Sequence, residues 1–494
     1  MLYRRTFAAA MVVAAFAFAG ATGAGAAQQA PDTAATSNGT ATPDCTTPAP
    51  THVYPWYHCY TPTDIASAYG VNTLQSQGVL GKGQTIVLVD SYGSPTAASD
   101  LNFFHDTFFP TLPKPSFEQL YPNGQPDYSN VGNGQSGSGG AAGWSGEATL
   151  DIEWSYAIAP LAHIVLLAVP PAETEGVQGF PNLFKAISDE IDAAPAGTVF
   201  SMSFGVTEQT FGGAAQGQTA KFDAVFQQGI AKGDTFFASS GDDGSLGTAK
   251  QHKDTAYYSI PTDGWPASSP YVTAVGGTQL QFGWTWAPTS DIAFLASGSE
   301  NPAYFASTTG GDLNAVWNES WLPAASGGGP SAIYSRPPWQ DGVASVIGSN
   351  ARGVPDVAWN AAVNGGVLVY ITAFPQYQRA GWHVYGGTSA ASPQVAALTA
   401  LAEEERATAH KKPLGNIDAL LYAHPKWFTD VTPVTEGTAQ SGKLVDNRDW
   451  DYNGDGSAVT PDAVPGWPVL KGYDMTTGLG TPAARAYVSG LAGS

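Results

Sequence analysis

The chain has 494 residues, of which 43% are hydrophobic and only 12% are charged, and its 41 acidic and 20 basic side chains give a formal net charge of −21. This acidic balance argues against nucleic acid or an anionic membrane surface as a partner, because both carry negative charge. After the N-terminal segment no run approaches the roughly 20 apolar residues of a membrane span, so we expect no membrane-embedded part. Few charges suit a protein that works in acid, where protonated carboxylates repel one another less.

The first 26 residues have the plan of a secretory signal peptide. Two arginines precede an apolar run over residues 6–19, and Ala24-Gly25-Ala26 matches an A-x-A cleavage site. Residues 27–52 are rich in Ala, Thr, Pro and Gln, which predicts a flexible arm ahead of a single domain over residues 53–494. We therefore expect a secreted, extracellular protein.

The chain contains only two cysteines, Cys45 and Cys59. Both lie in the N-terminal part of a chain that we expect to be exported, and oxidising compartments favour disulfides. The sequence therefore predicts one disulfide that ties the arm to the domain, with two free thiols as the alternative.

Strand-like and helix-like patterns alternate from about residue 60 onward. The first predicted helix starts with Thr and Pro and lies within Tyr60–Tyr69. Predicted strands cover residues 85–89, 164–169, 198–202, 235–238, 272–275 and 367–371, and predicted helices cover residues 146–159, 181–194, 218–232 and 389–407. Alternation of this kind, with apolar strands, predicts a parallel sheet with helices on both faces, which is a three-layer α/β/α fold.

Polar residues follow three of the predicted strands, at the sheet edge where α/β proteins usually place their sites. We interpret Asp90 as an ordinary turn residue, with the orientation of a catalytic base as the alternative. The stretch Ser203-Phe204-Gly205 could line a binding groove, although a plain exit from the strand explains it equally well. At the third position, a protonated Asp242 could donate a hydrogen bond to an oxyanion.

Two carboxylates stand one turn apart on the helix predicted for residues 146–159. Glu147 and Asp151 are separated by four residues, so they lie on one face and repel each other unless something requires the pair. The alternative is that both are simply exposed. Glu153 falls on another face, where we expect it to be in solvent.

The stretch GGTSAASP, residues 386–393, lies between a strand-like run at residues 366–372 and a helix-like run at residues 395–402. Ser389 is thereby placed at the start of a helix, where small glycines admit a substrate backbone and the helix N-terminus favours developing negative charge. We expect Pro393 in the first helical turn, which tolerates proline. A simple N-cap role for Ser389 is the alternative.

These residues, with several motifs around them, resemble the sedolisin family of serine-carboxyl peptidases. The motifs occur in family order over roughly residues 60–485: SMSFG at 201–205, WPASSPYVTAVGGT at 265–278, SGGGPS at 326–331, RPPWQ at 336–340, RGVPDVAWN at 352–360, GGTSAASP at 386–393 and YDMTTGLGTP at 473–482. Sedolisins commonly carry a large prodomain, for which the stretch between the predicted cleavage site and the domain is too short, so we expect this protein to lack one.

The resemblance implies a subtilisin-like fold and assigns four chemical roles. Ser389 would be the nucleophile, Glu147 the general base, Asp151 the residue that orients Glu147, and Asp242 the oxyanion-hole donor. Subtilisin-like enzymes carry their basic histidine in a His-Gly-Thr sequence, and none of the eight histidines here precedes Gly-Thr. A carboxylate base works where imidazole is already protonated, so we expect activity in acid.

The resemblance also implies a calcium site in the C-terminal part, at about residues 428–482. The ligands would be the carboxylates of Asp430 and Asp474 and the main-chain carbonyls of Val431, Leu470 and Gly472, a set of oxygen donors suited to Ca²⁺.

Independently of the family pattern, residues 451–462 match the spacing of an EF-hand loop, with Asp in the final position. We hypothesise a second calcium site there, and an Asx- and Gly-rich turn is the alternative. Its ligands would come from Asp451, Asn453, Asp455, Ser457 and Asp462.

Taken together, these features predict a secreted, monomeric serine-carboxyl endopeptidase that hydrolyses proteins or peptides at acidic pH. A tripeptidyl-peptidase of the same family, with a groove closed on one side, is one alternative. A catalytically silent binding protein on this scaffold is the other. A silent protein of this kind would be expected to lack one of the residues that carry the chemistry, and Ser389, Glu147, Asp151 and Asp242 are all present.

Overall fold

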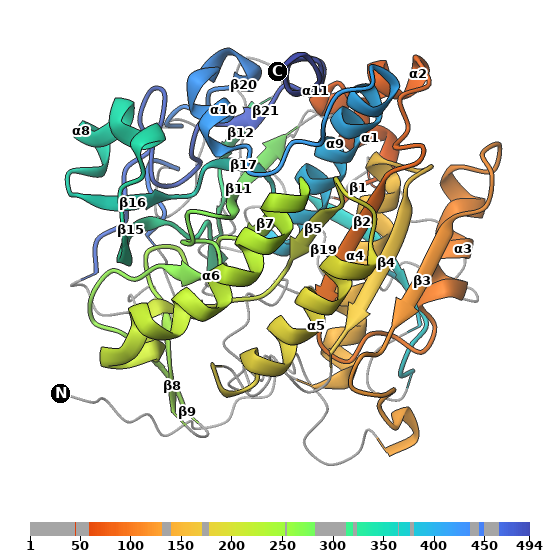
Figure 1. The fold of residues 1–494 in the computed structure, drawn as a ribbon, viewed down its shortest axis with the longest axis horizontal. Coiled ribbons are helices and arrows are strands. Elements are labelled where there is room, and N and C mark those ends of the chain that lie inside the picture. The colour runs from red at the N-terminus through yellow and green to blue at the C-terminus, as the bar shows by residue number, and fades with distance from the viewer. Residues whose placement is uncertain are drawn as a thin grey trace, which may run out of the picture.

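The computed structural model describes residues 45, 59–130, 140–169, 177–251, 254–281, 313–319, 324–363, 365–375, 380–434, 444–448 and 464–494. Within these residues no helix is both long enough and apolar enough to cross a lipid bilayer. The described chain forms a central sheet between two layers of helices (Figure 1).

The central sheet has eight strands in the order β12-β11-β7-β5-β2-β4-β3, with β17 paired to β11 beside this path. The pairs are parallel except for β11 with β12, so the prediction of a mainly parallel sheet is confirmed. Its strands are β2 (Thr85–Asp90), β3 (Ser116–Leu120), β4 (His163–Ala168), β5 (Val199–Met202), β7 (Thr235–Ser239), β11 (Thr273–Gln281), β12 (Leu313–Val316) and β17 (Val357–Asn360). The strands β2, β5 and β7 at the centre of the sheet are buried along their whole length because both faces are covered.

Helices from distant parts of the chain pair up on the sheet. The helix α4 (Ala141–Ile158) packs against α9 (Thr388–Thr408), and α3 (Ala97–Phe108) lies beside α4. In Figure 1 the near face of the sheet carries α5 (Phe180–Ala193) and α6 (Ala215–Lys232), which pack against each other. The four helices predicted from sequence are therefore all present, with ends that differ by only a few residues for most of them.

A second sheet lies beside the first and corrects one prediction. Residues 367–371 do form a strand, β18 (Gly366–Ile371), but it does not belong to the central sheet. It pairs in parallel with β1 (Cys59–Tyr60) and antiparallel with β19 (Gly381–Tyr385), a strand that the sequence did not predict. The chain therefore reaches GGTSAASP from β19, and the strand-like run at 366–372 lies one strand earlier.

The N-terminal helix and the disulfide agree with the sequence predictions. The helix α1 (Pro62–Tyr69) begins after Thr61, which forms a reciprocal capping box with Asp64. Cys45 and Cys59 are joined by a disulfide, with their Cα atoms 4.7 Å apart.

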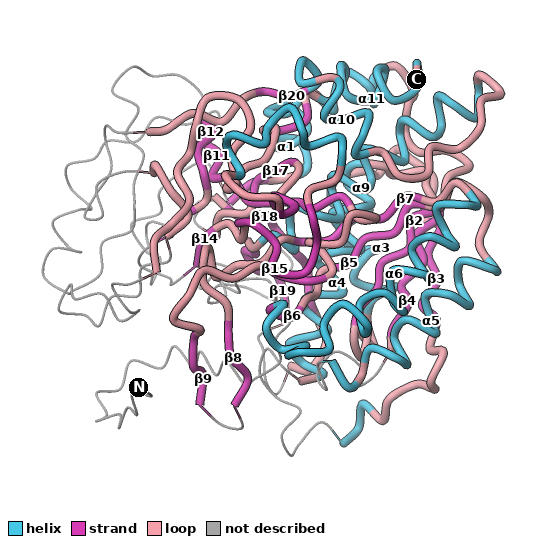
Figure 2. The backbone as a smooth tube through the Cα atoms, turned by 60° about the vertical axis from the view of Figure 1, so that its left-hand side comes forward, coloured by secondary structure: helices cyan, strands magenta, loops and turns pink. Residues whose placement is uncertain are grey.

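The remaining elements are short. Figure 2 shows the strands β8 (Thr248–Gln251) and β9 (Asp254–Tyr257) extending away from the body of the molecule. The other helical segments are α2 (Val71–Ser76), η1 (Tyr128–Asn130), η3 (Glu208–Ala214), η4 (Pro338–Val343), α8 (Ala344–Ile347), α10 (Asp418–Ala423), η5 (Pro425–Trp427) and α11 (Ala484–Gly493). The other strands are β6 (Val206–Thr207), β10 (Gly264–Trp265), β13 (Asn318–Glu319), β14 (Ala324–Ala325), β15 (Gly329–Ser335), β16 (Ala351–Val354), β20 (Phe428–Thr429) and β21 (Thr481–Pro482).

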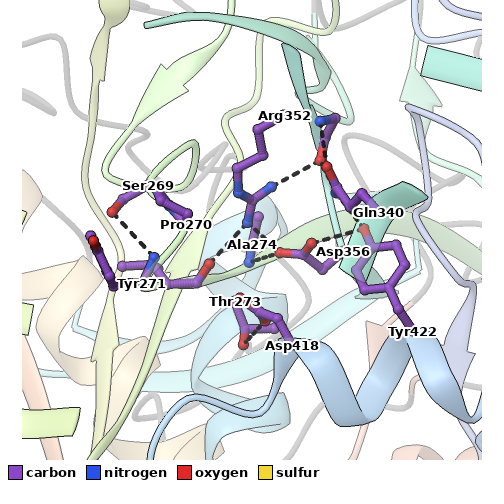
Figure 3. A network of polar contacts seen from close by, with 12 residues as sticks. Ser269, Pro270, Tyr271, Thr273, Ala274, Gln340, Arg352, Asp356, Asp418 and Tyr422 are labelled. Carbon is purple, nitrogen blue, oxygen red and sulfur yellow. Dashed lines mark hydrogen bonds and ion pairs between the residues drawn. The ribbon is translucent and has the colours of Figure 1, made fainter. Parts of the chain in front are cut away.

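A buried ion pair joins the sheet to the C-terminal helices (Figure 3). Arg352 and Asp356 are both fully buried, and Nη2 of Arg352 lies 2.6 Å from Oδ2 of Asp356. The same guanidinium nitrogen donates to the carbonyl of Val272 at 3.0 Å, and the Asp356 carboxylate accepts from the N–H of Ala274 at 2.7 Å and the Tyr422 hydroxyl at 2.9 Å. Because buried charges need such partners, this network fixes β11, the β16–β17 connection and α10 relative to one another.

Candidate active site

The two carboxylates one turn apart on α4 are both buried. Glu147 is 4% exposed and Asp151 is not exposed at all, which excludes the alternative that they are simply solvated. The helix is buried on every side because α3, α9 and β18 pack around it. Gly146, just before Glu147, lies so close to Tyr385 that a Cβ atom there would be 2.3 Å from the Tyr385 hydroxyl oxygen. Only glycine therefore fits at that position without a shift of Tyr385.

The prediction for Glu153 is wrong, because its side chain is buried instead of being in solvent. Oε2 of Glu153 accepts a hydrogen bond from the N–H of Tyr370 in β18 at 2.9 Å. Burial raises the pKa of Glu153 well above its usual value, an effect that this hydrogen bond opposes and that the nearby Asp100 reinforces. The reasoning from helix faces failed because no face of α4 meets water.

Ser389 is the second residue of α9. Gly387 precedes the helix with φ of 91°, in the left-handed region that favours glycine, so the N-cap role considered for Ser389 is not the one observed. Pro393 lies inside the helix and not in its first turn. Because proline has no N–H, the carbonyl of Ser389, four residues earlier, loses its helical donor. Oγ of Ser203 lies 3.4 Å from that carbonyl oxygen.

Ser203 also connects α9 to Asp151 on α4. It lies directly after β5, is fully buried, and its Oγ donates to Oδ1 of Asp151 at 3.0 Å. Two residues earlier, Ser201 makes the corresponding contact one turn further along α9, with its Oγ 3.0 Å from that of Ser392. The end of β5 thus brings Asp151 and the main chain of Ser389 to the same place.

Asp242 lies at the start of α9, beside Ser389. Its Oδ1 accepts two hydrogen bonds from Thr388, one from the main-chain N–H and one from the hydroxyl, each 2.8 Å long. The Thr388 hydroxyl also accepts from the N–H of Gly241 at 3.1 Å. These contacts hold the carboxyl of Asp242 against the residue that precedes Ser389. Thr388 is not among the site residues predicted from sequence, although its place beside Ser389 in GGTSAASP is a usable signal.

Two of the strand-end predictions need correction. The ring of Phe204 is buried, with its centroid 6.2 Å from that of Phe180, so this side chain belongs to the core and cannot line a groove. Asp90 is the last residue of β2 and is fully buried, so it is not part of a surface turn. Burial raises the pKa of Asp90 to about 8, which makes it a buried acid at the same sheet edge as Ser203.

Two carboxylates of the predicted calcium site converge on one loop. Both oxygens of Asp430 accept from the N–H of Gly472, at 3.1 and 3.0 Å, and Oδ2 of Asp474 accepts from the N–H of Leu470 at 3.0 Å. Carboxylate and main-chain carbonyl oxygens are the kind of donors that a hard cation accepts. Among the described residues no group of three or more His, Cys, Asp or Glu side chains could hold a metal ion. The EF-hand-like stretch 451–462 lies outside the described residues.

Comparison with known proteins identifies the family. Residues 142–420, which include α4, β5, the Asp242 region and the start of α9, match the model of the Subtilase family. The chain belongs to the subtilase family.

This subtilase is 29% identical to kumamolisin from Bacillus sp. (strain MN-32) over 429 residues, which cover 86% of this chain and 62% of the relative. It is 25% identical to tripeptidyl-peptidase sed1 from Aspergillus fumigatus over 464 residues, which cover 85% of this chain and 63% of the relative. The chain thus spans less than two thirds of the length of these relatives. Both findings support the resemblance to sedolisins.

The fold of this subtilase matches a solved sedolisin. The structure of Pseudomonas sedolisin (serine-carboxyl proteinase) complexed with two molecules of pseudo-iodotyrostatin shares it with a TM-score of 0.59 at 23% identity. The match covers 88% of this chain and 98% of that chain. The predicted subtilisin-like α/β/α architecture is therefore confirmed.

Proposed function

We propose that this subtilase is a serine-carboxyl peptidase, secreted and active in acid, that cleaves within protein or peptide chains. One observation carries the proposal: the buried Asp151, one turn from Glu147 on α4, meets the start of α9 through Ser203, and Asp242 approaches the same helix start through Thr388. Such an arrangement of nucleophile, base and oxyanion donor is what acyl transfer requires.

In the proposed reaction Glu147 takes the proton of the Ser389 hydroxyl while Oγ attacks the peptide carbonyl carbon. Asp151, held by Ser203, keeps Glu147 in place. The carbonyl oxygen becomes an oxyanion, the amine leaves with a proton returned by Glu147, and water then hydrolyses the acyl-enzyme by the same route in reverse order. The N-terminus of α9 favours the negative charge that develops at Ser389.

Asp242 has to be protonated to stabilise the oxyanion. Its Oδ1 already accepts two hydrogen bonds from Thr388, so a proton on this carboxyl belongs on Oδ2, which leaves Oδ2 as the donor. Glu147, in contrast, has to be ionised to act as a base. Both states coexist only where the two carboxyls titrate apart, which places the activity in the acidic range.

A tripeptidyl-peptidase is the second candidate function. The similarity to tripeptidyl-peptidase sed1 favours it, and the chemistry at Ser389 would be the same. The lengths of the products distinguish the two, because a tripeptidyl-peptidase releases three residues at a time from one end.

We also propose a structural calcium ion held by Asp430 and Asp474 with the carbonyls of Val431, Leu470 and Gly472. The convergence of both carboxylates on the 470–474 loop supports this set. A bound Ca²⁺ would supply positive charge that fixes this loop against the segment after β20. A second ion at Asp451–Asp462 stays a hypothesis from sequence.

The proposed function is tested by hydrolysis of a denatured protein between pH 2 and 8, with the products measured by mass spectrometry. We expect acid-optimal internal cleavage by the wild type and a loss of at least about a thousandfold in Ser389→Ala and Glu147→Gln. The partly exposed Glu405→Gln, on the same helix as Ser389 but far from its start, is the matched control and should retain full activity. Unchanged cleavage by Glu147→Gln would show that another group is the base.

A further inference from the structure

The loop that carries Asp242 is held against a glycine-rich segment of the chain. We call residues 240–245 the Asp242 loop and residues 325–328 the glycine-rich segment. The carbonyl of Asp242 accepts from the N–H of Ala325, and that of Gly241 accepts from the N–H of Gly327, both at 2.8 Å. The N–H of Gly244 in turn donates to the carbonyl of Ala325 at 3.0 Å. The position of the Asp242 carboxyl therefore depends on where the glycine-rich segment lies.

Close packing leaves these two stretches little room to move. A Cβ atom on Gly327 would lie 2.3 Å from the carbonyl oxygen of Ser240, and one on Gly328 would lie 2.4 Å from the carbonyl oxygen of Met475. The main chains can approach this closely only because both residues are glycines, which have no Cβ atom. A displacement of either stretch would therefore be transmitted directly to the other.

A residue from the C-terminal part of the chain, Asn447, is bonded to both stretches at once. It is fully buried, and its main-chain oxygen accepts from the N–H of Ser245 in the Asp242 loop at 3.1 Å. Its side-chain Nδ2 donates to two carbonyls of the glycine-rich segment, that of Ser326 at 3.0 Å and that of Gly328 at 3.4 Å. Asn447 thus closes a bridge between the two stretches from outside both of them.

The chemistry of these contacts requires an amide. Oδ1 of Asn447 accepts from the N–H of Trp467 at 2.7 Å, and a main-chain N–H can only donate, so this contact fixes which end of the amide is oxygen. The NH₂ group then faces the two carbonyls, which can only accept. Neither a carboxylate nor an aliphatic side chain of the same size offers one acceptor and two donors.

We propose that Asn447 is a positioning residue for the peptidase reaction, which sets the Asp242 loop and the glycine-rich segment in the one arrangement that aims the Asp242 carboxyl at the oxyanion. This inference rests on the proposed function. The hydrogen bonds of Asn447 go to the Asp242 loop, the glycine-rich segment and Trp467, so its effect on the reaction passes through main-chain geometry. A displacement of about 1 Å at a catalytic group can lower a rate by about a hundredfold.

The test is Asn447→Asp, which keeps the shape and the acceptor for Trp467. In its ionised form the new carboxylate puts an oxygen against the carbonyls of Ser326 and Gly328, and in its protonated form it can donate to one of them again. We expect kcat to fall about 10- to 100-fold at the upper end of the active pH range, with KM changed less than about threefold, because the interaction with the oxyanion exists only in the transition state. The ratio of the variant's kcat to that of the wild type should rise as the pH is lowered.

Asn360→Asp is the matched control for a buried Asn→Asp change. Asn360 is also fully buried, donates from Nδ2 to the carbonyl of Gly365 at 2.8 Å and accepts at Oδ1 from the N–H of Leu280 at 3.1 Å. Its bonds go to neither the Asp242 loop nor the glycine-rich segment. We expect it to lower the unfolding temperature but to leave kcat, measured well below that temperature, within about twofold of the wild type.

Asp242→Ala, which removes the donor altogether, Ser389→Ala and wild type are measured alongside, so that two kinds of failure can be told apart. If Asp242→Ala is inactive while Asn447→Asp keeps its kcat at every pH, this inference is overturned and the proposed function stands. A higher KM at unchanged kcat, or an equal loss of kcat in Asn360→Asp, would also overturn it. Full activity of Asp242→Ala or Ser389→Ala would refute the proposed function, and the role of Asn447 with it.

Discussion

The buried ion pair of Arg352 and Asp356 offers a direct test of the fold. In Arg352→Met the aliphatic part of the side chain is kept, but the Asp356 carboxylate loses its only cation in the network of Figure 3. The carbonyl of Val272, which accepts from the guanidinium at 3.0 Å, loses this donor as well, whereas the carbonyl of Gly353 still accepts from Nε2 of Gln340 at 2.8 Å. Burial of a carboxylate without its partner is far more costly than the absence of both charges.

The magnitude follows from what Asp356 retains. Removal of one partner of a buried pair typically costs about 3–5 kcal/mol. The N–H of Ala274 and the Tyr422 hydroxyl still bond the carboxylate, which limits the loss, whereas the Val272 carbonyl, which loses the guanidinium donor, adds to it. We therefore expect the free energy of unfolding to fall by about 4 kcal/mol at pH 7.

The assay is equilibrium unfolding in guanidinium chloride at pH 4 and pH 7, in a Ser389→Ala background that prevents self-digestion. The control is Lys185→Met, which removes a cation from the exposed pair of Lys185 with Asp189 on α5. Exposed pairs contribute little, so no measurable change is expected there. A cost of less than about 1 kcal/mol for Arg352→Met at pH 7 would refute this expectation.

Three further predictions concern α4, β5 and the calcium site. Glu153→Gln should gain stability over the wild type as the pH rises from 4 to 7, because burial raises the pKa of Glu153, whereas Glu405→Gln should show no such trend in the same unfolding assay. Ser203→Ala should lower kcat about tenfold at unchanged KM, because it removes the hydrogen bond to Asp151. Ser201→Ala, which removes only the contact with Ser392, should leave kcat within about twofold of the wild type. Equal effects of the two changes would show that the hydrogen bond from Ser203 to Asp151 does not matter for the reaction. Chelation of calcium should lower the unfolding temperature of the wild type by several degrees but not that of Asp474→Asn, and equal shifts would exclude this site.

The sequence predicted the central sheet well because local signals there are strong. The apolar runs at β2, β4, β5 and β7 are typical of strands buried on both faces. The run at β18 looks the same locally, yet it pairs with β1 and β19 in another sheet. Strand pairing depends on contacts between residues far apart in the chain, which an apolar run does not encode.

The candidate site could be predicted to a similar extent. Spacing alone put Glu147 and Asp151 on one face of a helix, and GGTSAASP put Ser389 at a helix start. The exposure of Glu153 was mispredicted because the surroundings of α4 are contributed by β18, more than two hundred residues later. The bridge made by Asn447 gave no signal at all, because a lone Asn between Asp and Arg has no distinctive local pattern.

Buried acids give the whole fold the same preference for low pH that the proposed chemistry requires. Burial raises the pKa of Asp223 and Asp234 to about 6, that of Glu403 to about 7 and that of Asp90 to about 8. A carboxyl whose pKa is higher in the folded than in the unfolded chain makes its full contribution to stability at a pH below both pKa values. This contribution is lost as the pH rises through the pKa of the folded chain. For these four groups the loss runs from about pH 4 to about pH 8. Since Asp242 can donate to an oxyanion only when protonated, the fold and the proposed reaction favour the same acidic range.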